Sequence, residues 1–390
     1  MRIVMITGEY PPMEGGVGDF TYKLSHALTA LKHEVHVLTS GGDAQTQEDG
    51  MTVHHKLADW GWGAHAKITR WLQEIQPDVI NIQYQAAAYQ MRGAINFYPR
   101  LQGKHVPAPL VTTFHDLRPP YLFPKAGPLR RWAVYWLAKY SDGIIVTNGA
   151  DYTELDQHLD TERRPRIKII HIGSNIAPNP PADYDRDAWR AAHGIGEEDL
   201  LLGFFGFLNA NKGVETLLQA LARLVHNGLP AHLIFIGGRT GSSDPTNREY
   251  ADSIDRLIVD LGLEARVHRT GFVKPSGVSA ALLASDICAL PYRDGVSLRR
   301  GTLHACLAHG CPIVTTEPST PLEDLQEGKH MLMVPPEDAK ALAEAIRRLW
   351  ETPELRARLS ENATVLAEAF SWERIAAHTA AFFRQLHARG

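Results

Sequence analysis

Short apolar runs alternate with amphipathic stretches along almost the whole chain. RIVMIT at residues 2–7 is apolar, the next stretch has apolar residues at helical spacing, and EVHVLTS at 34–40 is a second apolar run. This alternation predicts βαβ units with parallel strands, helices on both faces of each sheet, and ligands at the carboxyl ends of the strands. The predicted strands lie at residues 2–7, 34–40, 52–56, 78–84, 110–116, 142–148, 167–173, 200–207, 232–238, 266–272, 287–292, 312–316 and 330–336. The predicted helices include 66–76, a helix ending near residue 103, 128–140, 150–159, 212–227, 247–261, 275–284, 302–309 and 372–387.

A linker divides this alternation into two series. SNIAPNPPADYD at 174–185 is rich in Pro, Asn and Asp, and a new series of strands and helices starts after it. We therefore predict an α/β protein with two Rossmann-like, doubly wound domains at residues 1–176 and 186–371, joined by a linker at 177–185. The length of 390 residues also exceeds that of one average domain.

Composition and charge narrow the classes of function. The apolar fraction of 44% and the charged fraction of 22% are ordinary for a globular protein, and the net charge of −4 gives no reason to expect nucleic acid as a partner. No signal peptide or membrane-length apolar run is visible, so we expect a cytoplasmic protein. Cys288, Cys306 and Cys311 lack metal-type spacing and are expected to be small buried residues in a reducing compartment.

A glycine loop, GEYPPMEGGVGDF, follows the first predicted strand. Gly16 and Gly18 form G-x-G, but Thr21 stands where the dinucleotide fingerprint requires a third glycine. The second strand ends in Thr39-Ser40 and not in the acidic residue that would bind a ribose, which argues against NAD. A glycine loop at a helix N-terminus still suits a phosphate or sugar close to the backbone, and an ordinary tight turn is the alternative.

A second candidate anion site lies within residues 287–316, which are predicted to form a strand, a loop, a helix and a strand. The loop brings Arg299, Arg300, Gly301 and Thr302 to the N-terminus of the helix, and Gly310 ends that helix. Backbone N–H groups, the helix dipole and two guanidinium groups together favour a phosphate. A plain connection with a solvated arginine pair would explain this stretch equally well.

These motifs together resemble those of the retaining glycosyltransferases of family 4. The resemblance rests on EYPP followed by GGVG, a His-Asp pair ending a strand, Asn-Lys-Gly before a helix, IGG, ALAHGCPIVTT and MVPPED, in this order over nearly the whole chain. It implies the two-domain GT-B fold, with a nucleotide-sugar donor in the cleft, mostly on the C-terminal domain, and an acceptor on the N-terminal domain. It also implies that the last helix, about 372–390, packs back on the N-terminal domain.

The resemblance assigns roles to the residues that match the family motifs. Gly15 and Gly16 match the loop that approaches the donor phosphates and sugar, and His115 matches a histidine near the transferred sugar. Asn211 and Lys212 match the motif whose lysine neutralises the diphosphate leaving group. A fixed ammonium suits this role because departure of a nucleoside diphosphate builds negative charge.

The sequence departs from the family pattern in two places. The arginine that usually precedes the lysine is absent, because Phe207 follows Gly206, and we hypothesise that Arg299 or Arg300 replaces it at the diphosphate. An alignment without gaps places Ser297 and Ala305 at the family's two glutamates. We favour the alignment that treats residues 299–301 as an insertion and places Asp294, which would bind sugar hydroxyls, at the first glutamate, because Asp294-Gly295 resembles the family's Glu-Gly. The second, which normally holds the ribose, has no clear replacement.

The resemblance places recognition of the base largely in the backbone and shape around Gly237, Gly238 and the strand before Thr270-Gly271, where the side chains do not decide between uracil, guanine and adenine. The full set of expected donor-binding residues is Gly15, Gly16, Asn211, Lys212, Gly237, Gly238, Arg299, Arg300, Gly301 and Thr302.

Two further features each allow two explanations. Asp116 binds the acceptor or caps the following turn. The segment FPKAGPLRRWAVYWLAKY combines basic residues such as Lys125 with Trp132 and Trp136, which share one helix face. We favour packing of this face in the core, and a weak contact with a membrane surface or a lipid-linked acceptor is the alternative.

The predicted activity is transfer of a hexosyl unit from a UDP- or GDP-sugar to a hydroxyl of a carbohydrate, lipid-linked or small-molecule acceptor, with retention. His115, Lys212 and Asp294 are the predicted catalytic residues. No metal or other cofactor is expected, because no cluster in the sequence has metal-ligand spacing. The alternatives are a nucleotide-sugar epimerase on the same fold and a non-catalytic nucleotide-sugar-binding partner subunit.

Overall fold

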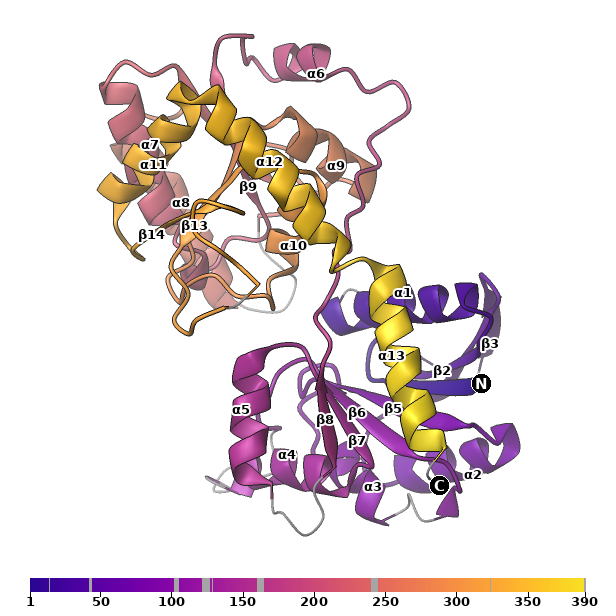
Figure 1. Ribbon diagram of the computed structural model, residues 1–390. Helices are drawn as coiled ribbons and strands as arrows, with labels where there is room; N and C mark the ends of the chain where they lie inside the picture. Colours follow the sequence, from indigo (N-terminus) through magenta and orange to yellow (C-terminus); the bar gives the residue numbers. More distant parts are fainter. Residues whose placement is uncertain are drawn as a thin grey trace. The chain divides into compact units, whose positions relative to one another are not determined.

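The computed structural model of the chain consists of two compact α/β units, and it describes residues 1–13, 15–41, 44–101, 105–120, 127, 129–159, 165–239, 245–322 and 324–388. The first unit comprises Met1–Asn175 and Ser371–Gly390, and the second comprises Ile176–Phe370. Each unit has one mainly parallel sheet between layers of helices (Figure 1). The predicted fold class is therefore confirmed.

An eight-stranded sheet forms the centre of the first unit, in the order β3-β4-β2-β1-β5-β6-β7-β8. Neighbouring strands are parallel, except that β3 is antiparallel to β4. The strands are β1 (Arg2–Thr7), β2 (Glu34–Ser40), β3 (Ala44–Glu48), β4 (Met51–Leu57), β5 (Val79–Tyr84), β6 (Leu110–Phe114), β7 (Gly143–Val146) and β8 (Arg166–Ile169).

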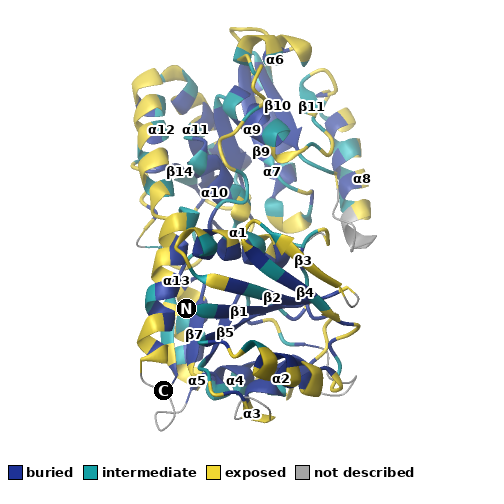
Figure 2. Cartoon of the chain, turned by 90° about the vertical axis from the view of Figure 1, so that its right-hand side faces the viewer, coloured by how far each residue is buried: buried dark blue, intermediate teal, exposed yellow. Residues whose placement is uncertain are grey.

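Successive side chains of these strands point into two apolar layers, as the pleat requires. Ile3 and Met5 of β1 pack in one layer and Val4 and Ile6 in the other. The first layer is covered by α1 (Gly16–Ala30) and α13 (Trp372–His387), and the second by α2 (Ala64–Ile75), η1 (Ala94–Phe97), α3 (Tyr98–Leu101), α4 (Leu129–Tyr140) and α5 (Gly149–His158). Figure 2 shows buried strands between helices whose outer faces are exposed.

The last helix, α13, packs on the sheet of the first unit beside α1. A Cβ added at Gly143 of β7 would lie 2.5 Å from Leu386 Cδ1 and 3.1 Å from the Phe382 ring, so the absence of a side chain at Gly143 lets the helix approach closely. At the start of α13, Trp372 Nε1 donates a hydrogen bond to the Ser174 carbonyl at 2.8 Å.

The second unit has a six-stranded, fully parallel sheet in the order β11-β10-β9-β12-β13-β14. The strands are β9 (Leu200–Phe205), β10 (Ala231–Ile236), β11 (Val267–Arg269), β12 (Ile287–Leu290), β13 (Ile313–Thr316) and β14 (Leu332–Val334). The helices are α6 (Arg186–Ala192), α7 (Val214–His226), α8 (Pro245–Asp260), α9 (Pro275–Ala284), α10 (Gly301–Ala308), α11 (Ala339–Glu351) and α12 (Pro353–Glu368). Helices α7, α8 and α11 cover one face, and α9 and α10 cover the other.

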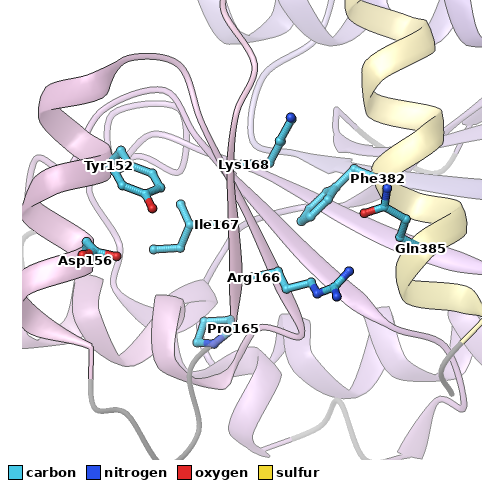
Figure 3. Close-up of a pocket in the computed structure, with 8 residues that line it drawn as sticks. All are labelled: Tyr152, Asp156, Pro165, Arg166, Ile167, Lys168, Phe382 and Gln385. Carbon is cyan, nitrogen blue, oxygen red and sulfur yellow. The ribbon is translucent and has the colours of Figure 1, made fainter.

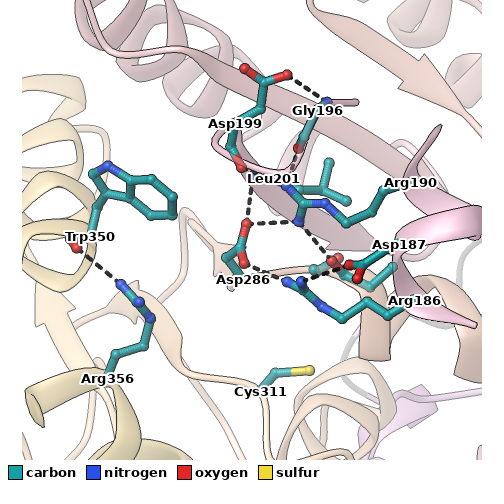
Figure 4. Close-up of polar contacts among 12 residues, drawn as sticks. Arg186, Asp187, Arg190, Gly196, Asp199, Leu201, Asp286, Cys311, Trp350 and Arg356 are labelled. Atoms are coloured by element: carbon teal, nitrogen blue, oxygen red, sulfur yellow. Dashed lines mark hydrogen bonds and ion pairs between the residues drawn. The ribbon is translucent and has the colours of Figure 1, made fainter. Parts of the chain in front are cut away.

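A buried ion pair ties α6 to this sheet (Figure 4). The side chain of Arg190 is only 2% exposed, and Nη1 donates to Asp286 Oδ2 at 3.0 Å. The same carboxylate oxygen accepts the N–H of Leu201 in β9 at 2.8 Å. Because Asp286 directly precedes β12, this network connects the amino ends of β9 and β12, the two central strands of the sheet.

The structure departs from the predicted elements in four places. Strand β3 was not predicted, because its polar sequence is an exposed edge strand without an apolar face. The short helix α6 was also not predicted. The predicted helix ending near residue 103 is replaced by turns, η1 and α3. Helix α7 begins at Val214 and not at Lys212, because Gly213 has a positive φ of 63° and separates it from the turn η4 (Ala210–Lys212).

The prediction that Trp132 packs in the core is wrong. Its side chain is 44% exposed, although Trp136 beside it is partly buried. Helix α4 buries a different face, made of Ala133, Val134, Leu137 and Ala138, because these smaller side chains fit closely against the sheet. Lys125 lies outside the described residues.

Candidate functional site

The candidate donor site of the second unit lies where the strand order of its sheet reverses, between β9 and β12. Doubly wound sheets bind their ligands there, at the carboxyl ends of the strands. Gly206 follows β9, Tyr292 follows β12, and Lys212 and Thr302 come from the segments that leave these strands. The four are close together, since a Cβ on Gly206 would lie 2.7 Å from Lys212 Nζ and 3.0 Å from Thr302 Cγ2.

Two glycines determine where the Lys212 side chain can lie. Gly206 has a φ of 118°, and any side chain there would collide with the ammonium group. Gly213 has a φ of 63°, and a Cβ there would lie 2.0 Å from the Pro291 carbonyl oxygen. The backbone carbonyl of Asn211, which is exposed, accepts the N–H of Arg293 at 3.0 Å. The Asn-Lys-Gly motif thus holds the lysine against the end of β12.

The Lys212 ammonium is partly buried, with no counter-ion on any residue that the structure describes. Among the described residues, no hydrogen-bond acceptor or carboxylate pairs with its Nζ, which lies 5.9 Å from the centre of the Tyr292 ring. Burial, and secondarily the charge of Arg300, lower the pKa of Lys212 to about 8. A positioned cation without a partner is suited to an anionic ligand that arrives from solvent.

Arg300 and Asp294 form an ion pair next to this lysine. Arg300 Nη2 donates to both carboxylate oxygens of Asp294, and the guanidinium lies 4.7 Å from the centre of the Tyr292 ring. Tyr292 is buried, and its hydroxyl hydrogen-bonds with Thr302 Oγ1 at 2.7 Å. Arg300, predicted to bind the diphosphate, and Asp294, predicted to bind the sugar, therefore bind each other in this structure. Each side chain would have to change its partner to bind a donor.

Helix α10 presents free backbone donors at its first turn. It begins at Gly301, one residue before the predicted start, and the Arg300 carbonyl accepts the N–H groups of Leu303 and His304 at 2.9 and 3.3 Å. Within the described part of the chain, the N–H groups of Gly301 and Thr302 have no acceptor. They can therefore bind an anion, as predicted for a helix N-terminus.

The other predicted donor residues of this unit lie on nearby loops. Gly237 follows β10 with a φ of 105°, and its N–H donates to Thr270 Oγ1 at 3.0 Å. A Cβ at Gly238 would lie 3.1 Å from the ring of Phe207, so this glycine leaves room for that exposed phenyl ring. Arg299 is exposed.

In the first unit, the N-terminus of α1 already holds a carboxylate. Glu9 Oε1 accepts the N–H groups of Val17 and Gly18 at 2.9 and 3.2 Å. Burial raises the pKa of Glu9, and the two hydrogen bonds lower it in part. Gly15 makes room for this side chain, since a Cβ there would lie 2.2 Å from Glu9 Oε1, whereas Gly16 faces open space. A phosphate at this helix N-terminus would have to displace the Glu9 carboxylate, and contact of Gly15 with a phosphate stays a prediction.

His115 follows β6 and ends a chain of buried hydrogen bonds. Its Nε2 lies 2.9 Å from Gln83 Oε1, Gln83 Nε2 donates to Asn81 Oδ1 at 2.6 Å, and Asn81 Nδ2 donates to Thr113 Oγ1 at 3.0 Å. Because an amide oxygen can only accept a hydrogen bond, Nε2 of the imidazole carries the proton and Nδ1 carries the lone pair. Phe20 of α1 packs against the imidazole, with ring centres 4.7 Å apart.

We expect His115 to be neutral at physiological pH. Burial lowers its pKa from 6.5 to about 4. The unfolded chain therefore binds this proton more readily, so the residue's contribution to the free energy of unfolding is full above pH 6.5 and is lost as the pH falls toward 4. An NMR titration of the imidazole should have its midpoint near pH 4, and His115→Gln should make unfolding less sensitive to acid. A midpoint near 6.5 would contradict the buried geometry.

Asp116 caps the turn that follows β6. Its Oδ1 accepts the N–H of Arg118 at 3.1 Å, and its Oδ2 accepts a hydrogen bond from Gln85 Nε2 at 3.0 Å. The structure therefore supports the capping explanation, and binding of an acceptor by Asp116 stays a prediction.

Metal-ligand residues do not cluster in the described part of the chain, where no three His, Cys, Asp or Glu side chains could hold a metal ion. The three cysteines are buried and unpaired by disulfides, as predicted. No helix among the described residues is long and apolar enough to cross a membrane.

The first unit has a surface pocket of about 480 Å³ (Figure 3). It is formed by α5, β8 and α13, and its lining includes Tyr152, Arg166 and Phe382. None of the predicted site residues lines it.

Sequence reasoning missed two residues of the candidate site. Glu9 lies in the EYPP motif, directly after β1, where an acidic residue facing a glycine loop is itself a signal for a cap. Tyr292 ends the apolar run ICALPY and connects Arg300, Lys212 and Thr302. Its role gave no signal in the sequence, because buried tyrosines are common at strand ends.

Solved structures with the same fold identify the architecture as GT-B. Sucrose-phosphate synthase from Thermosynechococcus elongatus superposes with a TM-score of 0.76 at 21% identity, covering 100% of both chains. The Anabaena protein Alr3699/HepE, solved in complex with UDP, has a TM-score of 0.75 at 20% identity and covers 99% of this chain and 100% of its own. At these identities the likeness defines the fold.

Family models then define the class of protein. Residues 14–177 match the model Glycosyltransferase Family 4, and residues 185–365 match the model Glycosyl transferases group 1. The two matches together cover most of both units. The chain belongs to this family of glycosyltransferases, and the predicted family is confirmed.

Curated relatives agree with this assignment. Alpha-D-kanosaminyltransferase of Streptomyces kanamyceticus is 24% identical over 284 residues, which is 71% of this chain and 70% of that protein. D-inositol 3-phosphate glycosyltransferase of Corynebacterium urealyticum is 27% identical over 260 residues, 66% of this chain and 60% of that protein. The match thus spans between three fifths and seven tenths of these relatives.

Proposed function

We propose that the protein transfers a hexosyl unit from a nucleoside-diphosphate sugar to an acceptor hydroxyl, with retention of the anomeric configuration. The observation that carries this proposal is the partly buried Lys212 ammonium, which has no counter-ion among the described residues and is held at the switch point of the second sheet by Gly206 and Gly213. The second unit binds the donor and the first unit binds the acceptor in this proposal.

The chemistry is mainly stabilisation of the departing diphosphate. When the bond between the sugar and the diphosphate oxygen breaks, the departing nucleoside diphosphate gains one negative charge. A fixed cation therefore stabilises the departing diphosphate more than it stabilises the bound donor. Lys212 supplies the cation, and the free N–H groups of Gly301 and Thr302 add hydrogen bonds. Thr302 Oγ1 is oriented for this by its hydrogen bond to Tyr292.

Arg300 and Asp294 exchange partners when the donor binds. The guanidinium moves from the Asp294 carboxylate to the diphosphate, which frees Asp294 to accept hydrogen bonds from sugar hydroxyls. In the first unit, His115 Nδ1 has a lone pair that can accept a hydrogen bond from a sugar hydroxyl, and Gly16 leaves space for the sugar.

The expected nucleotide is a uridine diphosphate, with guanosine diphosphate as the second candidate. Anabaena Alr3699/HepE has been solved with UDP and with UDP-glucose, which supports a uridine donor for this fold. We expect calorimetry to detect binding of UDP, weaker or no binding of GDP and ADP, and loss of binding in Lys212→Ala. Absence of binding by all three nucleotides would instead favour the non-catalytic alternative.

Arg300→Ala should weaken UDP binding more than Arg299→Ala. Arg300 lies at the Tyr292 ring beside Lys212, whereas Arg299 is exposed. A lost charge-assisted hydrogen bond is worth about 1.5–3 kcal/mol, or roughly tenfold to a hundredfold in affinity. The two variants carry the same net charge, so each controls for the other. Unchanged affinity in both would exclude these arginines from the diphosphate site.

We also propose that transfer needs no metal ion, since Lys212, Arg300 and backbone N–H groups can bind the diphosphate themselves. Activity that survives treatment with a chelator would support this. The anomeric configuration of the product, read by NMR, tests retention, and release of free nucleoside diphosphate with glycosylated acceptor separates transfer from epimerisation.

A further inference from the structure

Five aromatic rings form a continuous ladder on one face of the first unit. Trp62 contacts Phe97 with ring centres 5.4 Å apart, and Phe97 contacts Trp132 at 6.0 Å. Trp132 packs on Trp136, and Trp136 packs on Tyr140, both at 4.6 Å. The ladder runs from the residues before α2, across η1, along α4. These elements cover the same face of the sheet (Figures 1 and 2).

This face exposes large apolar side chains. Trp62 is 61% exposed and Trp132 is 44% exposed, and Leu129, one turn before Trp132 on α4, is 53% exposed. Leu101 at the end of α3 and Met91 before η1 are exposed as well. Apolar side chains gathered on one surface mark a site of interaction, because burial from water would stabilise the contact.

The same elements are strongly basic, although the whole chain has a net charge of −4. Helices α2, α3 and α4 carry one acidic residue, Glu74, and six basic residues, which are Lys67, Arg70, Arg100, Arg130, Arg131 and Lys139. Lys67 and Arg70 are exposed on α2, and within the described residues neither has an ion-pair partner. Arg100 lies over the Tyr140 ring at 5.5 Å, next to the aromatic ladder.

We propose that this aromatic and basic face, formed by Trp62 and helices α2, α3 and α4, docks on the surface of an anionic lipid bilayer. Tryptophan and tyrosine rings favour the boundary between headgroups and hydrocarbon, and lysines and arginines are attracted to anionic headgroups. A second copy of the chain is a poorer occupant, because a two-fold interface would bring the basic residues of both copies together. The proposal does not depend on the transfer reaction.

Vesicle binding tests the proposal with the full chain. We expect the protein to cosediment with vesicles of equal parts phosphatidylcholine and phosphatidylglycerol, and the bound fraction to fall at high salt. It should not cosediment with vesicles of phosphatidylcholine alone. Trp62→Ala combined with Trp132→Ala should abolish most of the binding. Both side chains are exposed, so the double variant should keep its fold, which circular dichroism can verify.

Paired charge reversals show whether the position of the charges matters. Lys67→Glu with Arg70→Glu should lower affinity for the anionic vesicles by about thirtyfold or more. The control is Arg347→Glu with Arg358→Glu, two exposed arginines on α11 and α12 of the second unit, which changes the net charge equally. We expect the control to stay within about threefold of the parent protein.

Three outcomes would overturn the proposal. The first is that the parent protein fails to bind anionic vesicles. The second is that both charge reversals weaken binding equally, which would make the attraction a property of the whole chain. Alternatively, sedimentation could show a dimer that the tryptophan double variant dissociates without any vesicle binding, which would assign the face to a second copy of the chain.

Discussion

Lys212→Met is expected to abolish transfer and at the same time stabilise the protein. Loss of a positioned charge at a departing anion typically lowers kcat by about a hundredfold to a thousandfold. The partly buried ammonium has no counter-ion in the part of the chain that the structure describes, and burial lowers its pKa from 10.5 to about 8. Removing it should therefore raise the free energy of unfolding at neutral pH by about 1–3 kcal/mol.

The lowered pKa of Lys212 also makes protein stability and donor affinity depend on pH. Because the folded protein holds this proton less tightly than the unfolded chain, the destabilisation is full below pH 8 and disappears as the pH rises from about 8 to 10.5. Donor affinity should fall above pH 8, because the neutral amine no longer attracts the diphosphate. Lys212→Met should show neither dependence.

Steady-state kinetics and urea unfolding check this prediction together. The matched control is Lys340→Met, because Lys340 is 73% exposed on α11 and its loss should change neither activity nor stability appreciably. If Lys212→Met is inactive and also less stable than the parent protein, the lysine stabilises the folded structure and the prediction is wrong. Full activity would remove Lys212 from the mechanism.

Gly213→Ala is expected to destabilise the second unit by about 3 kcal/mol or more and to prevent nucleotide binding. The left-handed backbone at φ 63° accounts for about 1 kcal/mol. The greater part comes from the Pro291 carbonyl, 2.0 Å from the added Cβ, because neither backbone segment can move without displacing the other. Relief of this clash would move Lys212 away from the end of β12.

Gly262→Ala is the matched control for this substitution. Gly262 has nearly the same backbone, with a φ of 64°, and nothing lies within 4 Å of a Cβ placed there. It should therefore show only the backbone effect of about 1 kcal/mol and bind nucleotide normally. Urea midpoints and calorimetry of the two variants measure the difference. Equal destabilisation in both would mean that the contact with Pro291 has no effect.

Most of the fold was predictable because each central strand carries its own signal. The apolar runs that became β1, β9 and β12 are almost entirely buried, and strands buried on both faces are apolar along nearly their whole length. Strand β3 carried no such signal, since AQTQE is an exposed edge strand. The turns between residues 85 and 93 look like a helix in sequence because Ala, Gln, Met and Arg, which favour helices, predominate there.

The candidate site was partly predictable, because some of its residues serve purely local needs. The left-handed backbone of Gly213, with a φ of 63°, and that of Gly310, with a φ of 61°, are local needs that favour glycine, whereas the contact of Gly213 with the Pro291 carbonyl is tertiary. The roles of Gly15, Asp294 and Arg300 depend on contacts with other segments. The sequence shows only that each of these residues is polar or small, and a polar or small residue can contact many different partners.

The sequence by itself determined the two doubly wound sheets, the family and the position of Lys212 before a helix, because periodicity and turn chemistry act between neighbours in the chain. The tertiary structure decided that Glu9 fills the N-terminus of α1, that Arg300 pairs with Asp294 and that Trp132 faces solvent. The physical reason is that partners of charges and rings come from whichever segments the fold brings together. A pattern along one segment carries no information on the distance to another.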